Sequence, residues 1–145
     1  MRFSLRLNND LTLPEYVSLA RAAERAGFDQ IWVSHDLFLR SAMVILPAMA
    51  LATEHINVGA GIFNPYSLNP AELAMFAATM DELSGNRFNL GLAAGAGEFL
   101  KWIGIAQSTP LAAVRETIET IRALQRGDRA ALSGEFLHWS NEAYL

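Results

Sequence analysis

Ile56-Asn-Val-Gly-Ala-Gly-Ile-Phe-Asn-Pro-Tyr66 is the stretch that decides the fold, because an apolar strand runs directly into a loop with Asn-Pro turn chemistry. Gly59 and Gly61 have no Cβ, so we expect a flat ligand to approach the main chain closely there. A second junction of this kind follows, where the apolar stretch 88–92 leads into the small residues 93–97. Two strands that end in small-residue loops predict repeated strand-loop-helix units with a shared binding face.

Short apolar strands alternate with amphipathic helices along the whole chain. We expect strands over 3–7, 30–33, 56–60 and 87–92, with helices starting at Pro14, near Ala42, at Pro70 and at Pro110. Pro47 conflicts with a helix over 42–53, so that helix either starts late or is kinked. The pattern predicts an α/β protein whose parallel sheet is buried on both faces.

Four such units make half of an eightfold barrel. A (β/α)8 barrel of the TIM type needs about 250 residues, so we expect the 145-residue chain to cover its first four βα units, the N-terminal half. An open doubly wound sheet also satisfies the alternation. We expect one domain over 1–145, with an irregular loop or hairpin over 126–145.

Three expectations concern packing. Trp32 is expected in the core, and Glu116 on the polar face of the last helix. The apolar stripe of that helix is expected to consist of Leu111, Val114, Ile118, Ile121 and Leu124.

The composition excludes several classes of function. The net charge is -4 and no Lys/Arg cluster is present, which argues against a nucleic-acid partner and favours a small-molecule substrate. The absence of cysteine excludes disulfides, thiolate zinc sites and thiol catalysis, and no His-rich motif supplies ligands for a metal. The first residues resemble neither a signal peptide nor a membrane span, so we expect a cytoplasmic protein with no membrane partner.

Polar residues lie where the expected strands end. His35 and Asp36 follow the second strand. One interpretation is that they contact a cofactor or relay a proton, and the other is that they belong to a solvated loop. A hydrolytic triad with Ser34 is disfavoured, because neighbours in sequence cannot easily align nucleophile, base and acid. Asn64 and Tyr66 also have two interpretations: either of them contacts the cofactor or the substrate, or the Asn-Pro-Tyr sequence simply forms a turn.

The small residues of the fourth loop have two interpretations as well. Ala94, Gly95, Ala96 and Gly97 either contact a cofactor through backbone N–H groups or make a tight turn.

Three segments together carry a resemblance to a known family: 26–33 (Ala-Gly-Phe-Asp-Gln-Ile-Trp-Val), 59–66 (Gly-Ala-Gly-Ile-Phe-Asn-Pro-Tyr) and 81–92 (Asp-Glu-Leu-Ser-Gly-Asn-Arg-Phe-Asn-Leu-Gly-Leu). In this order they resemble the bacterial-luciferase-like flavin-dependent oxidoreductases. The loop over 59–66 looks most similar to the branch that uses the deazaflavin coenzyme F420, that of the methylenetetrahydromethanopterin reductases. The resemblance covers roughly 1–128.

The resemblance implies a TIM barrel in which the cofactor ring lies over a bulge after the third strand, with a cis peptide between Gly61 and Ile62. It implies hydride transfer by F420 to or from a small organic substrate, or an FMN-dependent monooxygenase as the alternative. The resemblance implies cofactor contacts at Gly61 and Ile62. Asn64, beside the expected bulge, and Ala94–Gly97, after the fourth strand, are further candidate cofactor contacts from their positions in the chain. The catalytic candidates are His35 and Asp36, although the family's Asp-His order is reversed here.

Two positions depart from the reductase pattern. Arg6 replaces an acid on the first strand, and Ala96 replaces an Asp in the fourth loop, so the substrate of that reductase branch is not implied. A non-catalytic half-barrel that needs a partner or the missing half is a further alternative. Because a half-barrel leaves sheet edges open, we expect a homo-oligomer.

Overall fold

The computed structural model describes residues 1–129 and 131–145, so that Ala130, within the predicted segment 126–145, lies outside the described residues. Contacts divide the chain into two compact units. Unit 1 comprises Met1–Phe63 and Thr79–Gly91, and unit 2 comprises Asn64–Ala78 and Leu92–Leu145. The single domain over 1–145 stays a prediction.

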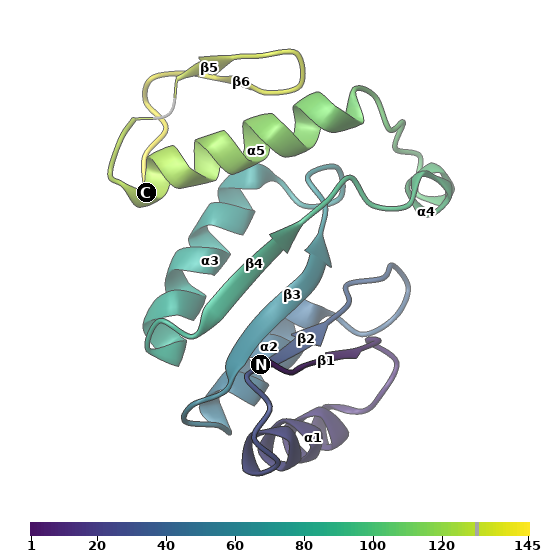
Figure 1. Cartoon of the computed structure of the whole chain (residues 1–145). Helices are drawn as coiled ribbons and strands as arrows, with labels where there is room; N and C mark the ends of the chain where they lie inside the picture. Colours follow the sequence, from purple (N-terminus) through teal and green to yellow (C-terminus); the bar gives the residue numbers. More distant parts are fainter. Residues whose placement is uncertain (130) are drawn as a thin grey trace. The chain divides into compact units, whose positions relative to one another are not determined.

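A sheet with the strand order β1-β2-β3-β4 forms the centre of unit 1 (Figure 1). Its strands are β1 (Ser4–Leu7), β2 (Gln30–Val33), β3 (Asn57–Phe63) and β4 (Phe88–Leu92). The pairs β1·β2 and β2·β3 are parallel. The predicted α/β fold is therefore confirmed, and β3 extends three residues beyond the predicted end at Ala60, from Gly61 to Phe63.

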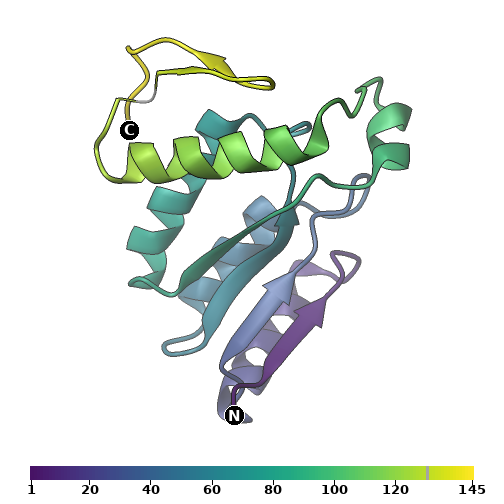
Figure 2. The same ribbon diagram turned by 45° about the horizontal axis from the view of Figure 1, so that its top comes forward.

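Two helices of unit 1 lie on one face of this sheet (Figure 2). In α1 (Leu13–Arg25), Glu15 Oε2 accepts the N–H of Thr12 at 2.7 Å, and Gly27, with φ of 79°, ends the helix. In α2 (Ala42–Leu51), Pro47 lies inside the helix, so the late start is wrong. The sheet side chains Ile31, Val33, Val58 and Ala60 are fully buried on this face, as expected for alternate residues of strands beneath helices.

The opposite face of the sheet, here called the open face, carries the other alternate residues. On β1, β2 and β3 they are Ser4, Arg6, Gln30, Trp32, Asn57, Gly59 and Gly61. The register places Arg6 beside Trp32 and Trp32 beside Gly59, so one row crosses three strands. Trp32 is only partly buried on this face, so the expectation that it lies in the core is wrong. Successive side chains of β2 point to opposite faces of the sheet. Because Ile31 and Val33 point to the helix-covered face, Trp32 between them points to the open face.

Two charged residues fix the loop that precedes β3. Glu24 Oε1 accepts the backbone N–H groups of residues 54, 55 and 56 at 2.9, 2.6 and 2.9 Å. The Arg87 guanidinium donates to the carbonyls of Ala50, Thr53 and Ile56 at 2.9, 3.0 and 2.7 Å. Both residues act at the end of the sheet where β3 begins. Arg87 satisfies the Ala50 carbonyl, which the end of α2 leaves unpaired, and Glu24 satisfies N–H groups of the loop after it.

Unit 2 contains part of α3 (Pro70–Ser84), the short helix α4 (Gly97–Trp102), α5 (Pro110–Gln125) and an antiparallel hairpin. The hairpin strands are β5 (Leu132–Ser133) and β6 (His138–Trp139), and they lie alongside α5 (Figure 1). The Glu116 side chain explains this placement, since its two carboxylate oxygens accept the N–H groups of residues 135, 136 and 137, each at 3.0 Å.

The predicted burial pattern of α5 is wrong in two respects. Glu116 is 3% exposed and not part of a polar surface, because its carboxylate holds the hairpin. Leu111 is 87% exposed, whereas Ile121 and Leu124 are buried as predicted. The buried face is therefore rotated toward Ala112, Ala113 and the polar residues 116, 117 and 120.

Candidate functional site

The imidazole of His35 is held by the start of α2. Its Nδ1 accepts the backbone N–H of Ala42 at 3.2 Å, and its ring meets the ring of Phe63 edge-on at 5.0 Å. Burial lowers the pKa of His35 below its usual value, opposed by the nearby charge of Asp36. A neutral imidazole that accepts at Nδ1 carries its proton on Nε2. His35 is therefore a hydrogen-bond donor through Nε2–H, which has no partner among the described residues.

Asp36 is exposed, and its main chain is tied to the loop after β1. Asn9, which is fully buried, donates from Nδ2 to the carbonyls of Asp36 and Arg40 at 3.0 and 2.7 Å. Asn9 Oδ1 accepts the Asp36 N–H at 3.2 Å. In the described chain no hydrogen bond joins the Asp36 carboxylate to the His35 ring, so the N-terminus of α2 orients the imidazole instead.

The structure brings His35 to the end of β3, where the peptide bond between Gly61 and Ile62 is cis. This confirms the implied cis peptide. The contact between His35 and Phe63 places the ring next to the residue that follows Ile62. Both Gly61 and Ile62 are only partly buried.

Gly59 and Gly61 differ in what they face. A Cβ on Gly59 would lie 2.4 Å from Cε3 of Trp32, so the indole ring fills the space that the missing side chain leaves. A Cβ on Gly61 would lie 3.6 Å from Trp32, which is ordinary contact. The expected close approach of a ligand at Gly59 is therefore wrong, and of this pair only Gly61 could carry a Cβ without a clash.

In unit 2, Asn64 and Tyr66 are engaged in local structure. Asn64 is buried, and its Oδ1 accepts the N–H groups of Tyr66 and Ser67 at 3.1 and 2.9 Å, which is the turn interpretation. The Tyr66 hydroxyl donates to the carbonyl of Ser108. Burial raises the pKa of Tyr66, which keeps the hydroxyl protonated as a donor. Only the amide nitrogen of Asn64 is left for another partner.

The loop over Ala94–Gly97 is closed by one side chain. Gln107 Nε2 donates to the carbonyls of Ala94 and Gly95 at 2.7 and 3.1 Å. Gly95 has φ of 77°, and a Cβ there would lie 3.1 Å from the Asn64 side chain, so glycine is needed for both reasons. Gln107 was missed at the sequence level, because a glutamine in a long loop gives no pattern. The predicted cofactor contacts over Ala94–Gly97 stay a prediction.

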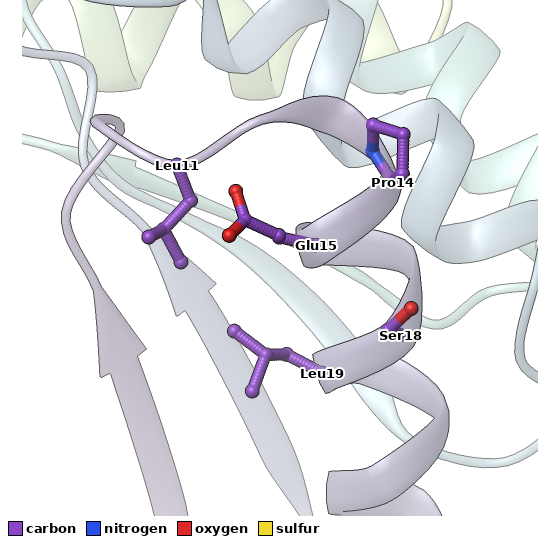
Figure 3. A pocket seen from close by; sticks show the side chains of 5 residues that line it. All are labelled: Leu11, Pro14, Glu15, Ser18 and Leu19. Atoms are coloured by element: carbon purple, nitrogen blue, oxygen red, sulfur yellow. The ribbon is translucent and has the colours of Figure 1, made fainter.

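A pocket of about 430 Å³ lies elsewhere in unit 1. It is lined by Leu11, Pro14, Glu15, Ser18 and Leu19, between the loop after β1 and the first turns of α1 (Figure 3). None of these residues is a predicted site residue. Over residues 1–129 and 131–145, no cluster of three or more His, Asp or Glu side chains is arranged to hold a metal ion. The described helices are all too short or too polar to cross a lipid bilayer.

The family model for luciferase-like monooxygenases matches residues 1–144. The chain belongs to this family. In sequence it is similar to 5,10-methylenetetrahydromethanopterin reductase of Archaeoglobus fulgidus, with 34% identity over 97% of the chain and 42% of the relative. It is also similar to F420-dependent glucose-6-phosphate dehydrogenase of Amycolatopsis mediterranei, with 34% identity over 84% of the chain and 40% of the relative.

Solved structures agree with this relationship. Coenzyme F420 dependent tetrahydromethanopterin reductase from Methanopyrus kandleri superimposes with a TM-score of 0.91 and 25% identity, over 99% of the chain and 46% of that protein. The oxygenating constituent of 3,6-diketocamphane monooxygenase from Pseudomonas putida, in complex with FMN, shares the fold with a TM-score of 0.82 and 18% identity, over 94% of the chain and 42% of that protein. The chain thus spans less than half the length of the proteins it matches, in agreement with the N-terminal half of a luciferase-like barrel.

Proposed function

We propose that the chain is part of an oxidoreductase that binds coenzyme F420 and transfers hydride to or from a small organic substrate. One observation carries this proposal. The relatives at 34% identity differ in the substrate that their names state, a pterin in one and a sugar phosphate in the other. F420 dependence is named for the sugar-phosphate dehydrogenase and for the structurally similar pterin reductase. F420 is therefore the cofactor that the names of two relatives with different substrates both state, and the substrate of this chain stays open.

The residues of unit 1 fit a planar redox ring. Gly61 leaves room above the backbone on the open face, and Ile62 beside it is partly exposed. His35 presents Nε2–H close to the end of β3, where it could donate to a carbonyl or ring nitrogen of such a cofactor. A mostly apolar surface with a few precisely placed polar groups is the usual make-up of a cofactor site.

F420, when bound, supplies the hydride chemistry, and the protein supplies position and environment. In our proposal Gly61 and Ile62 support the ring, and His35 holds its polar edge as a neutral donor. Because α2 occupies Nδ1, His35 does not act as a base at neutral pH. Asp36 is exposed and keeps its carboxylate available to the substrate. Asn64 and Ala94–Gly97 remain proposed cofactor contacts from the sequence alone.

An FMN-dependent monooxygenase is the second candidate. The description of the matching family as luciferase-like monooxygenases favours it. Such an enzyme would use the same surface at Gly61 for an isoalloxazine ring, so the two candidates differ in cofactor and not in the residues that we assign.

Titration of the purified chain with F420 and, separately, with FMN tests the proposal. Cofactor fluorescence and absorbance give a Kd for each. We expect saturable binding with a preference for F420. A Gly61→Leu variant places a side chain in the space above β3 and should weaken binding at least tenfold, which corresponds to about 1.4 kcal/mol. Ser18→Leu, in the pocket beside α1, is the matched control and should bind as the unmodified chain does.

Three outcomes decide between the alternatives. Preference for FMN would replace F420 by the second candidate. Binding that Ser18→Leu weakens and Gly61→Leu does not would move the cofactor to α1 and refute the assigned surface. A folded chain that binds neither cofactor would support the non-catalytic half-barrel.

Oligomeric state and location belong to the same proposal. β1 and β4 are the outer strands of the sheet, and unpaired strand edges favour association, which supports a homo-oligomer. We also propose a cytoplasmic location. Cell fractionation of the native host with an antibody to the chain would test it.

A further inference from the structure

The open face of the sheet carries one charged side chain, Arg6 on β1, in the row of Trp32 and Gly59. The Arg6 side chain is exposed but fixed in place. Its Nη2 donates to Oγ of Ser34 at 2.6 Å, and its Nη1 donates to Oδ1 of Asn8 at 3.4 Å. Ser34 is 1% exposed, so a buried hydroxyl anchors the guanidinium to the end of β2.

The positive charge of Arg6 is not neutralised by the chain. Ion pairs among the described residues involve His55, Arg115 and Arg126, and none involves Arg6. A guanidinium has five N–H donors in a fixed fork, and Ser34 and Asn8 account for two bonds. The remaining donors point to no described partner. An arginine that is held rigid, charged and unpaired is suited to bidentate recognition of a carboxylate or phosphate.

Arg6 lies on the same face of the sheet as Gly61, at a distance that a small ligand can span. Parallel strands lie about 4.8 Å apart, so Arg6 is about 10 Å, two strand spacings, from Gly59 along the row. Gly61 lies two residues further along β3 on the same face. A molecule that reacts above Gly61 and carries an anionic group at the other end of a short skeleton would span this distance.

We propose that Arg6, anchored by Ser34, binds an oxyanion of the ligand that occupies the open face, either a carboxylate or a phosphate. The assignment of the open face to a ligand rests on the proposed function. Arg6 is then a specificity-determining residue that selects anionic substrates, or it holds a phosphate of the cofactor. Neutral molecules of the same size lose the charge-assisted hydrogen bonds and bind less well.

Titration of the isotope-labelled chain with inorganic phosphate, followed by NMR, tests the oxyanion site directly. Sodium chloride at equal ionic strength is the reference. We expect saturable shifts at the Arg6 side chain, the Ser34 amide and the Trp32 indole N–H. Arg6→Gln should weaken this binding about tenfold or more. Arg25→Gln, which removes the same charge from an exposed position at the end of α1, should leave it unchanged. The amide spectrum shows in each case whether the variant is folded.

The source of the anion follows from a second titration, with F420 and with its phosphate-free deazaflavin chromophore. If Arg6→Gln weakens F420 binding and not chromophore binding, the anion is the cofactor phosphate. If it weakens neither, while phosphate binding is lost, the anion belongs to the substrate. Phosphate binding in a chain that binds no F420 would leave the oxyanion site standing while the proposed function fails.

Two results would overturn the oxyanion site. One is the absence of saturable shifts at Arg6, Ser34 and Trp32 in the unmodified chain. The other is phosphate binding to a folded Arg6→Gln variant with unchanged affinity.

Discussion

The protonation state of His35 determines what this side chain can do. Its Nδ1 accepts the first N–H of α2, and burial lowers its pKa, so the imidazole is neutral and donates from Nε2. The sequence predicted that His35 follows the second strand, at the end of the sheet where the binding face was expected. It could not predict the partner of Nδ1, because Ala42 meets the ring only after the loop has folded back. The same limit applies to Asn9, because its hydrogen bonds to Asp36 and Arg40 join two loops that are about thirty residues apart in the chain.

The depressed pKa of His35 makes stability depend on pH. The unfolded chain takes up a proton near the ordinary value of 6.5, whereas the folded chain does so only at lower pH. Stability is therefore complete above pH 6.5 and decreases as the pH falls below it, until the folded pKa is passed. We expect urea unfolding to show lower stability at pH 5.5 than at pH 7.5. His35→Gln should flatten this decrease, and His55→Gln, at an exposed position, should not. Identical profiles of stability against pH for all three proteins would show that the lowered pKa of His35 is not the cause.

At the scale of the elements, charged side chains that are partly or fully buried hold loops in place by binding backbone groups. Glu24, Arg87 and Glu116 all do so. Arg87 belongs to the family segment 81–92, but the resemblance assigned it no role, and Glu24 and Glu116 belong to no motif. Alternation and helix starts placed the strands and helices well, because these depend on local sequence. The burial of Glu116 depends on a hairpin about twenty residues later in the chain, and helical periodicity carries no such information.

Glu116→Gln should release the hairpin from α5. The amide puts an NH2 group where the carboxylate accepts three backbone N–H groups, so at least one of these bonds is lost. We expect faster hydrogen exchange at residues 135–137 and little change in unit 1. Glu119→Gln, an exposed position on the same helix, is the control. Exchange that is the same in both variants would mean that the carboxylate does not hold the hairpin.

The Glu116 interaction should also weaken in acid. Hydrogen bonds from the backbone, first that of Leu137, lower the pKa of Glu116 below 4.5. The stabilisation is present above pH 4.5 and is lost as the pH falls through the lower folded pKa. Thermal melts between pH 6 and pH 3 should therefore converge for the unmodified chain and Glu116→Gln at the acid end. A difference between them that stays constant over this range would exclude the charge as the cause.

Arg87→Lys should destabilise unit 1. Lysine keeps the charge but cannot reach the carbonyls of Ala50, Thr53 and Ile56 together, because it lacks the planar fork. The expected loss is about 1.5 to 3 kcal/mol of unfolding free energy, the range for charge-assisted hydrogen bonds. Denaturant unfolding measures it, with Arg122→Lys on the exposed side of α5 as the control. A loss no larger than that of the control would show that the loop before β3 needs no such anchor.

For the whole molecule, the four parallel βα units match the first half of a luciferase-like barrel. β1 and β4 remain outer strands with unpaired backbone groups. We therefore expect light scattering on the purified chain to give a mass of at least twice 15.9 kDa. A monomer at every concentration would contradict the proposed self-association.

The sequence could predict the barrel half, because strand and helix alternation and the motif order are properties of the chain itself. Through the family resemblance it could also predict the cis peptide between Gly61 and Ile62. It could not predict that the Trp32 ring fills the space at Gly59, since that contact joins β2 and β3. The cis peptide within β3 was therefore predictable, whereas the contact of Trp32 with the neighbouring strand was not.

The central claim is that the end of β3 supports a planar redox cofactor. The most direct measurement is the map of backbone amide NMR shifts during titration with F420. We expect the largest saturable shifts to include Gly61, Ile62 and His35. Shifts confined to Leu11, Ser18 and Leu19 at the α1 pocket, or no saturable shifts at Gly61, would contradict it.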